Sequence, residues 1–336
     1  MYQSHVFRNV LFCLILCVWW APAQAKPIEV KVFIAAMFEI GQNSGDKAGE
    51  FQFWYERYFM HSEAIKVAGA QNPVYCNDNG VCGGVLGMGK VGSSSSLQAI
   101  LLNDKFDLSH SYFLISGVGG TPPSRGTIGD VSWGSWLVDY DLGHRWKPEE
   151  GIKGQHTFMP RQGYEDIRRY QVNPLLLEWS LALSQGVTLK DSPAAQTYRM
   201  RYPQAAARRL PAVNKGTHMT GDTFFHGPGL SQEAQYIASS YGADDYVITE
   251  MEVTAIAQVL SRTVGIQRLM SLRGAVNFDQ GNPNETTLAH LDPAPGQTAG
   301  GFAETVENIV LVGSKVVDHI VQHWDVWQQD IPSRNK

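Results

Sequence analysis

Two glutamates, Glu250 and Glu252, stand two positions apart at the start of an apolar stretch in the segment TEMEVTAIAQVL. Carboxylate oxygens only accept hydrogen bonds. Burying them beside apolar residues is costly unless a donor or a cation pairs with them. The pair therefore predicts one of two things. It either receives a ligand with adjacent hydroxyl donors, or it is a pair at a strand end that is solvated or joined in salt bridges.

A glycine-rich segment, Gly87–Gly92, fits the GxGxxG pattern of a dinucleotide site. Such a site also needs an acid about 20 residues further on, at the end of the next strand, to hold the ribose. The next apolar run ends Leu114-Ile115-Ser116-Gly117 and contains no acid. The glycines therefore favour a tight turn from strand to helix, and we expect no organic cofactor.

Cys76 and Cys82 flank the segment NDNG, whose residues strongly favour a tight turn between two short apolar runs. A hairpin there would bring the two sulfurs together, and in an oxidising compartment we expect a disulfide. Two cysteines without nearby histidines do not complete a zinc site, so no metal is predicted.

The N-terminus has the pattern of a secretory signal peptide. The apolar run 10–20 follows His5 and Arg8, and small residues at Ala23 and Ala25 predict a cut after Ala25. The run is short for a bilayer span, although an uncleaved anchor is the alternative. The expected location is therefore secreted or periplasmic, with no membrane span in the mature chain.

The composition indicates a globular protein with a large core. The chain has 336 residues, 43% hydrophobic and 18% charged, and a net charge of −5. A mildly acidic chain without a basic run is a poor candidate for binding polymeric nucleic acid.

The order of apolar patterns indicates an α/β sheet. Strands are expected at 28–37, 111–120 and 268–278, with a cysteine hairpin at 73–89. Helices are expected at 51–60 (or a lid), at 93–104, from Asn173 as N-cap to Gly186, and at about 303–325.

Short segments resemble, in this order, motifs of the purine nucleoside phosphorylase/nucleosidase superfamily: GMGKVGSSSS (87–96), SGVGG (116–120), GDV (129–131), TGDTFF (220–225), EME (250–252) and RGAVNFD (273–279). The purine nucleoside permease branch is closer still, because of the cysteine pair, MTGDTFFHG (219–227), NFD and HWDVW (323–327). The resemblance implies a three-layer α/β/α sandwich with a distorted mixed sheet. It also implies a single domain at 26–336, elaborated at about 140–217.

Members of this superfamily cleave the bond between ribose and a base, through a transition state in which positive charge grows on the sugar. The resemblance implies that Glu252 accepts hydrogen bonds from the 2′- and 3′-hydroxyls, that Met251 packs on the sugar, and that Glu250 is a second polar contact. It further implies that Phe224 stacks on the purine and that His226 contacts the 5′-hydroxyl. For each of these residues an ordinary structural role is the alternative.

Asn277 departs from the nucleosidase pattern, which has Asp at that place. An amide can bind purine N7 and a 6-substituent, but it cannot transfer a proton as Asp can. Asp279 is the candidate replacement for the acid, provided that it faces the same pocket.

The sequence does not decide whether phosphate or water attacks the sugar. Ser116, Gly117 and Gly119, with Arg125 nearby, would cradle phosphate as a co-substrate. In hydrolysis, Glu39, which is offset by one residue from the nucleosidase pattern, would instead position a water molecule for attack on the sugar. A non-catalytic protein that binds nucleosides for uptake is the alternative function. The sequence leaves base preference open, and also whether the protein is a monomer or a homo-oligomer.

Overall fold

The structure, a computed structural model, describes residues 26–293 and 298–334. The predicted signal peptide, 1–25, lies outside the described residues. Within the described ranges, no helix has the length and apolar character needed to cross a bilayer.

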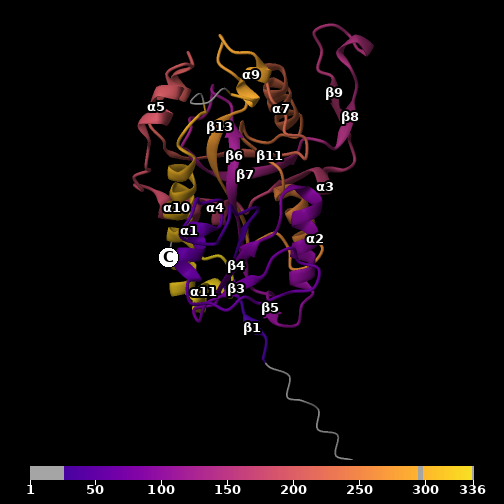
Figure 1. The fold of residues 1–336 in the computed structure, drawn as a ribbon. Helices are drawn as coiled ribbons and strands as arrows, with labels where there is room; N and C mark the ends of the chain where they lie inside the picture. The colour runs from indigo at the N-terminus through magenta and orange to yellow at the C-terminus, as the bar shows by residue number, and fades with distance from the viewer. Residues whose placement is uncertain (1–25, 294–297, 335–336) are drawn as a thin grey trace, which may run out of the picture.

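Among the described residues, a mixed sheet of nine strands forms the centre of the molecule (Figure 1). Its strands, in spatial order, are β10 (Arg169–Gln171), β7 (Val131–Asp139), β11 (Val213–Thr220), β12 (Tyr246–Glu250), β6 (Tyr112–Thr121), β2 (Val32–Ala36), β4 (Val81–Val85) and β3 (Val74–Cys76). The ninth strand, β13 (Leu269–Phe278), pairs with both β6 and β7. It therefore closes β6, β12, β11 and β7 into a ring, which is the distortion that the sheet was expected to have.

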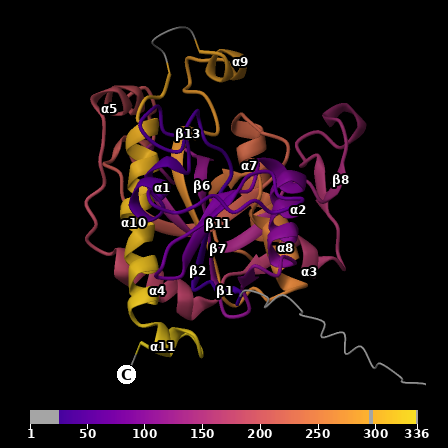
Figure 2. The same cartoon turned by 60° about the horizontal axis from the view of Figure 1, so that its bottom comes forward.

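Two groups of helices cover the sheet. Figures 1 and 2 show α1 (Gln52–Tyr58), α4 (Pro174–Ser184) and α10 (Phe302–Gln322) on one side, and α2 (Gly89–Leu101), α7 (Pro228–Ser240) and α8 (Val253–Ser261) on the other. The chain therefore has the predicted layered α/β/α arrangement. The remaining short elements are β1 (Ile28–Glu29), β5 (Phe106–Asp107), β8 (Gly143–Arg145), η1 (Pro148–Glu150), β9 (Phe158–Pro160), α3 (Glu165–Arg168), α5 (Pro193–Arg199), α6 (Ala205–Arg208), α9 (Thr287–Leu291) and α11 (Trp324–Trp327).

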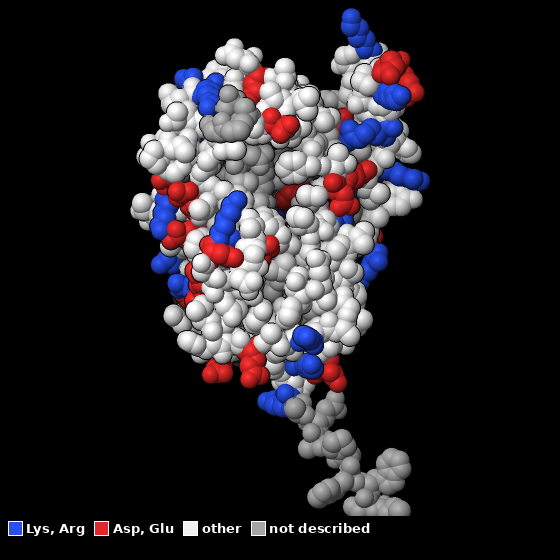
Figure 3. All heavy atoms as spheres, viewed as in Figure 1, with Lys and Arg blue, Asp and Glu red and all other residues white. Residues whose placement is uncertain are grey.

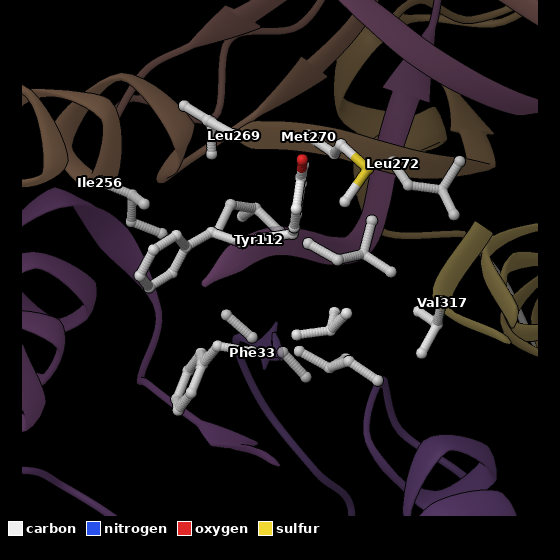
Figure 4. Close-up of a cluster of buried hydrophobic side chains, with 14 of the residues drawn as sticks. Phe33, Tyr112, Ile256, Leu269, Met270, Leu272 and Val317 are labelled. Atoms are coloured by element: carbon white, nitrogen blue, oxygen red, sulfur yellow. The ribbon is translucent and has the colours of Figure 1, made fainter. Parts of the chain in front are cut away.

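The core lies between the sheet and these helices. Figure 4 shows part of it, where Phe33 of β2, Tyr112 of β6, Leu272 of β13 and Val317 of α10 meet. All five residues of β2 are buried, because β2 lies between the parallel strands β4 and β6. Strands covered on both faces are typically continuous apolar runs.

The strand predicted at 28–37 is divided in the structure. Ile28–Glu29 pair with β5, and Val32–Ala36 pair with β4 and β6. Between them the amide of Lys31 donates to the carbonyl of Gly80, 2.8 Å away. The apolar pattern continues across this change of partner and therefore does not reveal it.

Residues 140–217 contain a two-stranded arm, β8 and β9, and several short helices. Glu233 on α7 joins the arm to the body, because it accepts hydrogen bonds from the hydroxyl of Tyr140, the guanidinium of Arg145 and the hydroxyl of Thr157. That this region elaborates a single domain stays a prediction.

The predicted hairpin and its disulfide are present. Strands β3 and β4 are antiparallel, and Cys76 lies directly opposite Cys82 and is bonded to it. Asn77 stabilises the turn, since its side-chain oxygen accepts hydrogen bonds from the amides of Asn79 and Val81.

Replacing both Cys76 and Cys82 with serine is expected to lower the free energy of unfolding by about 2 kcal/mol, because a short cross-linked loop removes little entropy from the unfolded chain. Urea unfolding of the mature chain, before and after the substitutions, measures the difference. Two reactive thiols in the denatured, unreduced wild-type protein would contradict the prediction.

Candidate functional site

A buried cluster of charged side chains joins the end of β12 to β13, two strands that both pair with β6. Nη2 of Arg273 is 2.8 Å from a carboxylate oxygen of Glu250 and 3.1 Å from one of Glu252. All three residues are less than 5% exposed. The two glutamates are thus paired with a cation, and they are buried rather than solvated.

Glu250 accepts four hydrogen bonds. One oxygen accepts from the hydroxyl of Thr220. The other accepts from Arg273 and, at 2.9 Å each, from the backbone amides of Glu252 and Val253 at the start of α8. Helix-start amides have no partner within the helix, so Glu250 fixes both the end of β12 and the beginning of α8.

Glu252 makes fewer contacts. Its Oε1 accepts from the amide of Gly89, 2.9 Å away at the start of α2, and its Oε2 contacts Arg273. Gly89 has a φ of +75°, a conformation that glycine adopts most readily. The turn predicted from Gly87–Gly92 therefore places a helix N-terminus against this carboxylate.

A third buried carboxylate, Glu50, belongs to the same group of charges. Its oxygens accept hydrogen bonds from the amides of Met37, at 2.8 Å, and Val118, at 2.7 Å. Burial raises the pKa of Glu50 to about 7, with the charge of Glu252 adding to the rise and that of Arg273 opposing it. Burial likewise raises the pKa of Glu252 against the opposing effect of Arg273.

Sequence reasoning did not identify Glu50 or Arg273 as site residues. Arg273 lies within the quoted segment RGAVNFD, and an arginine in an otherwise apolar strand is itself a sign of a buried partner. Glu50 has no comparable signal, because its partners come from residues 37 and 118, far from it along the chain.

Glu39 is placed as a loop anchor. Its two oxygens accept hydrogen bonds from the amides of Ile40, Gly49, Phe51 and Gln52. Those amides belong to the loop before α1 and to its first turn. This arrangement fills the lone pairs of Glu39, and its role in aiming water stays a prediction.

The segment Ser116–Gly119 lies on β6 beside the charged cluster. The hydroxyl of Ser116 is 2.8 Å from Nε1 of Trp54, and the residue is fully buried. A Cβ atom at Gly117 would come within 2.6 Å of both Nη1 of Arg273 and Oε1 of Glu50. At Gly119, it would meet the carbonyl oxygen of Thr249 at 2.5 Å. Both glycines are therefore required by close packing.

Asn277 and Asp279 lie at the end of β13, beyond an irregularity in its pairing with β6 between Ala275 and Asn277. Bulges of this kind change the direction of side chains and are frequent next to active sites. Asn277 is half-buried beside Gly120. Asp279 is 1% exposed, and its Oδ2 accepts from the hydroxyl of Tyr246 at 3.0 Å. Burial raises the pKa of Asp279 to about 6.

The loop after β11 holds the remaining candidates. Phe224 is 55% exposed, whereas its neighbour Phe225 is buried and stacks on Tyr140 with ring centroids 4.3 Å apart. His226 is buried, and its Nε2 lies 2.6 Å from Nδ1 of His290. Burial and the neighbouring imidazole lower the pKa of His226 to about 4, so it is neutral at physiological pH.

A hollow of about 300 Å³ is lined by Glu39 and by residues next to the charged cluster, although Glu50, Glu250, Glu252 and Arg273 are not in its lining. Its lining includes Met37, whose amide binds Glu50, and Met88, which precedes Gly89. Met251 is half-buried and is not part of this lining. The space-filling view in Figure 3 shows acidic atoms deep in a hollow near the centre of the drawn face.

Comparisons with known proteins agree on one family. Residues 29–332 match the family model described as purine nucleoside permease (NUP). The chain is 27% identical to a probable purine nucleoside permease of Schizosaccharomyces pombe, over 96% of this chain and 99% of that protein. It is 28% identical to the purine nucleoside permease of Candida albicans, over 89% of this chain and 78% of that protein.

Solved structures show the same fold. A 5′-methylthioadenosine/S-adenosylhomocysteine nucleosidase from Colwellia psychrerythraea, in complex with adenine, superposes with a TM-score of 0.52 at 15% identity, over 87% of this chain and 95% of that one. A futalosine hydrolase mutant from Helicobacter pylori gives 0.52 at 16% identity, over 86% and 99%. The predicted nucleoside phosphorylase-like fold is therefore confirmed.

Proposed function

Because the chain belongs to the purine nucleoside permease family, we propose that it binds purine ribonucleosides and cleaves the bond between their ribose and their base, outside the cytoplasm. The observation that carries the proposal is the buried Glu250–Arg273–Glu252 cluster, held against the N-termini of two helices. This cluster presents a fixed carboxylate at one end of the sheet.

We assign the ribose contact to Glu252 because its carboxylate has hydrogen-bond acceptor positions still free. A carboxylate has about four lone-pair positions. Among the residues that the structure describes, Glu250 accepts four contacts, from Thr220 on Oε1 and from Glu252, Val253 and Arg273 on Oε2, whereas Glu252 accepts two, from Gly89 on Oε1 and from Arg273 on Oε2. The two positions left on Glu252 match two adjacent hydroxyl donors, which are the 2′- and 3′-hydroxyls of a ribose.

The base is assigned to the region around the end of β13 and the loop after β11. Asn277 offers an amide to N7 and to the 6-substituent of a purine, and Phe224 has an exposed ring for stacking. Asp279, with its pKa raised to about 6, is assigned as the source of the proton for the leaving base. Its Oδ1 has no hydrogen-bond partner among the described residues.

The proposed location has two supports. The first is the predicted signal peptide, and the second is the Cys76–Cys82 disulfide, which is typical of an oxidising compartment.

A second function, nucleoside binding in support of uptake, is favoured by the names of the relatives and by Asn277, which cannot act as an acid. Binding needs Glu252, Phe224 and Asn277 but no proton transfer. In this case another protein would carry the nucleoside across the membrane.

The test is to incubate the purified mature chain with inosine, with adenosine and, as a control, with uridine. We expect free hypoxanthine or adenine by chromatography, and no uracil. Calorimetric titration of the same nucleosides separates the two functions. Binding of purine nucleosides without release of base would support the second function, and absence of any purine nucleoside binding would contradict both.

A further inference from the structure

Glu50 ties the end of β2 to the glycine segment of β6. It accepts the amide of Met37 on one oxygen and the amide of Val118 on the other. It is 5% exposed, and each oxygen keeps one lone-pair position that no contact among the described residues uses. A buried carboxylate with spare acceptor capacity is available for chemistry.

Glu50 occupies the place that a phosphate ion would need. The Ser116–Gly119 segment was the candidate anion cradle, but its Val118 amide already donates to Glu50. The Ser116 hydroxyl contacts the Trp54 indole, and the guanidinium of Arg273 is engaged by Glu250 and Glu252. The Ser116 hydroxyl accepts from that indole and keeps its own hydrogen. An incoming phosphate would nevertheless meet the like charge of Glu50, with the Val118 amide and the Arg273 guanidinium already in use, which disfavours its binding.

The charges around Glu50 do not balance when all are ionised. In the described part of the chain, Glu50, Glu250 and Glu252 share the guanidinium of Arg273, in a region shielded from water. Buried like charges disfavour one another, and one carboxyl group then holds its proton to a higher pH. The pKa of Glu50, raised to about 7, makes it the group that gains and loses a proton near neutrality.

Glycine at 117 lets Glu50 and Arg273 pack closely against the backbone of β6. Any side chain there would collide with Oε1 of Glu50 and Nη1 of Arg273 at 2.6 Å. Arg273 also joins Glu50 electrostatically to Glu252, to which the ribose is assigned. Glu50 is thus close to the sugar side of the proposed substrate.

We propose that the chain is a hydrolase in which Glu50 is the general base for water; this inference rests on the proposed function. The carboxylate of Glu50 takes one proton from water, and the water oxygen forms a bond to C1′ of the ribose. The bond from C1′ to the purine nitrogen breaks, and its electron pair leaves with the base, which takes up the proton of Asp279. Asp279 then regains a proton from solvent. The products are free ribose and purine, and Glu50 returns its proton to solvent.

The first experiment identifies the nucleophile. The wild-type mature chain is incubated with inosine in ¹⁸O-labelled water, with and without inorganic phosphate. We expect equal rates in the two conditions, free ribose as the sugar product, and the label on its C1 hydroxyl when the sugar is trapped at once by reduction. A requirement for phosphate, or formation of ribose 1-phosphate, would overturn the proposal.

The second experiment tests Glu50 itself. Glu50→Gln is expected to lower kcat by about 10²–10⁴ while the Kd for inosine changes little, because general base catalysis contributes about that much. In the wild type, kcat/KM should rise with pH as the carboxyl group of Glu50 loses its proton, and fall again as Asp279, the proton source for the base, loses its own. Glu50→Gln should lose this rise, and Glu50→Asp should keep it at reduced kcat.

Glu149→Gln, a change at an exposed glutamate, is the matched control and should behave as the wild type. Wild-type kcat or an unchanged pH profile in Glu50→Gln would refute the role of Glu50. If Glu50→Gln does not bind inosine, the Glu50→Asp variant becomes the test. Loss of the rise in kcat/KM with pH in Glu50→Asp would then refute the role of Glu50 as general base. Cleavage that requires phosphate and yields ribose 1-phosphate would overturn this inference alone, whereas binding of inosine without cleavage, or no binding, would overturn the proposed cleavage as well.

Discussion

Glu252→Ala is expected to lower kcat/KM for purine ribonucleosides by about 10²–10⁴. The variant loses two hydrogen bonds from the ribose hydroxyls to a carboxylate, each worth about 1.5–3 kcal/mol. Their sum, about 3–6 kcal/mol, converts to that range of rate. Glu252→Gln should lose less, because one acceptor oxygen remains. The measurement is release of base at low substrate, or the Kd by calorimetry if no cleavage occurs.

Glu250→Ala provides the contrasting variant. Glu250 receives hydrogen bonds from Thr220, two backbone amides and Arg273, so its removal should cost mainly stability. Its effect on substrate handling should be the smaller of the two, once the protein is folded. Glu252→Ala leaves Arg273 paired with Glu250, so its urea midpoint should stay close to that of the wild type.

A substrate without a 2′-hydroxyl distinguishes a ribose contact from an indirect effect. Glu252→Ala should discriminate less between inosine and 2′-deoxyinosine than the wild type does, because the contact to that hydroxyl is already absent. If folded Glu252→Ala handles ribonucleosides as well as the wild type, the ribose assignment is wrong.

Elements determined by neighbouring residues were predictable from the sequence. The side chain of Asn173 caps α4 by accepting the amides of Leu175 and Leu176, and Gly186 follows the helix with a φ of +80°. The NDNG turn likewise brought Cys76 opposite Cys82. In each case the deciding contacts lie within a few residues, so the local pattern contains the information.

Only those site residues that lie in the family's motifs could be predicted from the sequence. The order of these motifs placed Glu250 and Glu252 beside the segment containing Arg273, but the partners of Glu50 come from β2 and β6. Contacts between residues so far apart depend on which strands are neighbours, and periodicity does not encode that.

The directions of Asn277 and Asp279 were also beyond sequence reasoning. Strict alternation would place both on one face, but β13 ends at Phe278, so the alternation does not extend to Asp279. The irregularity between Ala275 and Asn277 also changes the direction of Asn277 relative to the preceding part of the strand. Asp279 instead meets Tyr246 of β12, and Asn277 lies beside Gly120 of β6. An extra residue in a strand leaves no reliable mark in composition, since many residue types occupy bulges.

Arg273→Met is expected to lower the free energy of unfolding by about 3–5 kcal/mol, because it leaves buried carboxylates without their counter-charge. Arg57→Met is the matched control. The Arg57–Asp318 pair is largely exposed, with side chains 45% and 34% accessible, and should contribute about 0–1 kcal/mol. Urea unfolding of the three proteins at one pH measures both differences.

The loss in Arg273→Met should also depend on pH in a definite direction. Arg273 lowers the pKa of Glu50, so its removal moves that pKa from about 7 further above its ordinary value of 4.5. Between these pH values the folded state holds more protons than the unfolded state, so stability falls as pH rises. The deficit of the variant should therefore be larger at about pH 8 than at about pH 5. Adding Glu50→Gln to Arg273→Met removes one of the uncompensated charges and should recover part of the stability at the higher pH. A deficit that is independent of pH, or no recovery in the double variant, would show that Arg273 stabilises the fold by packing and not by neutralising these carboxylates.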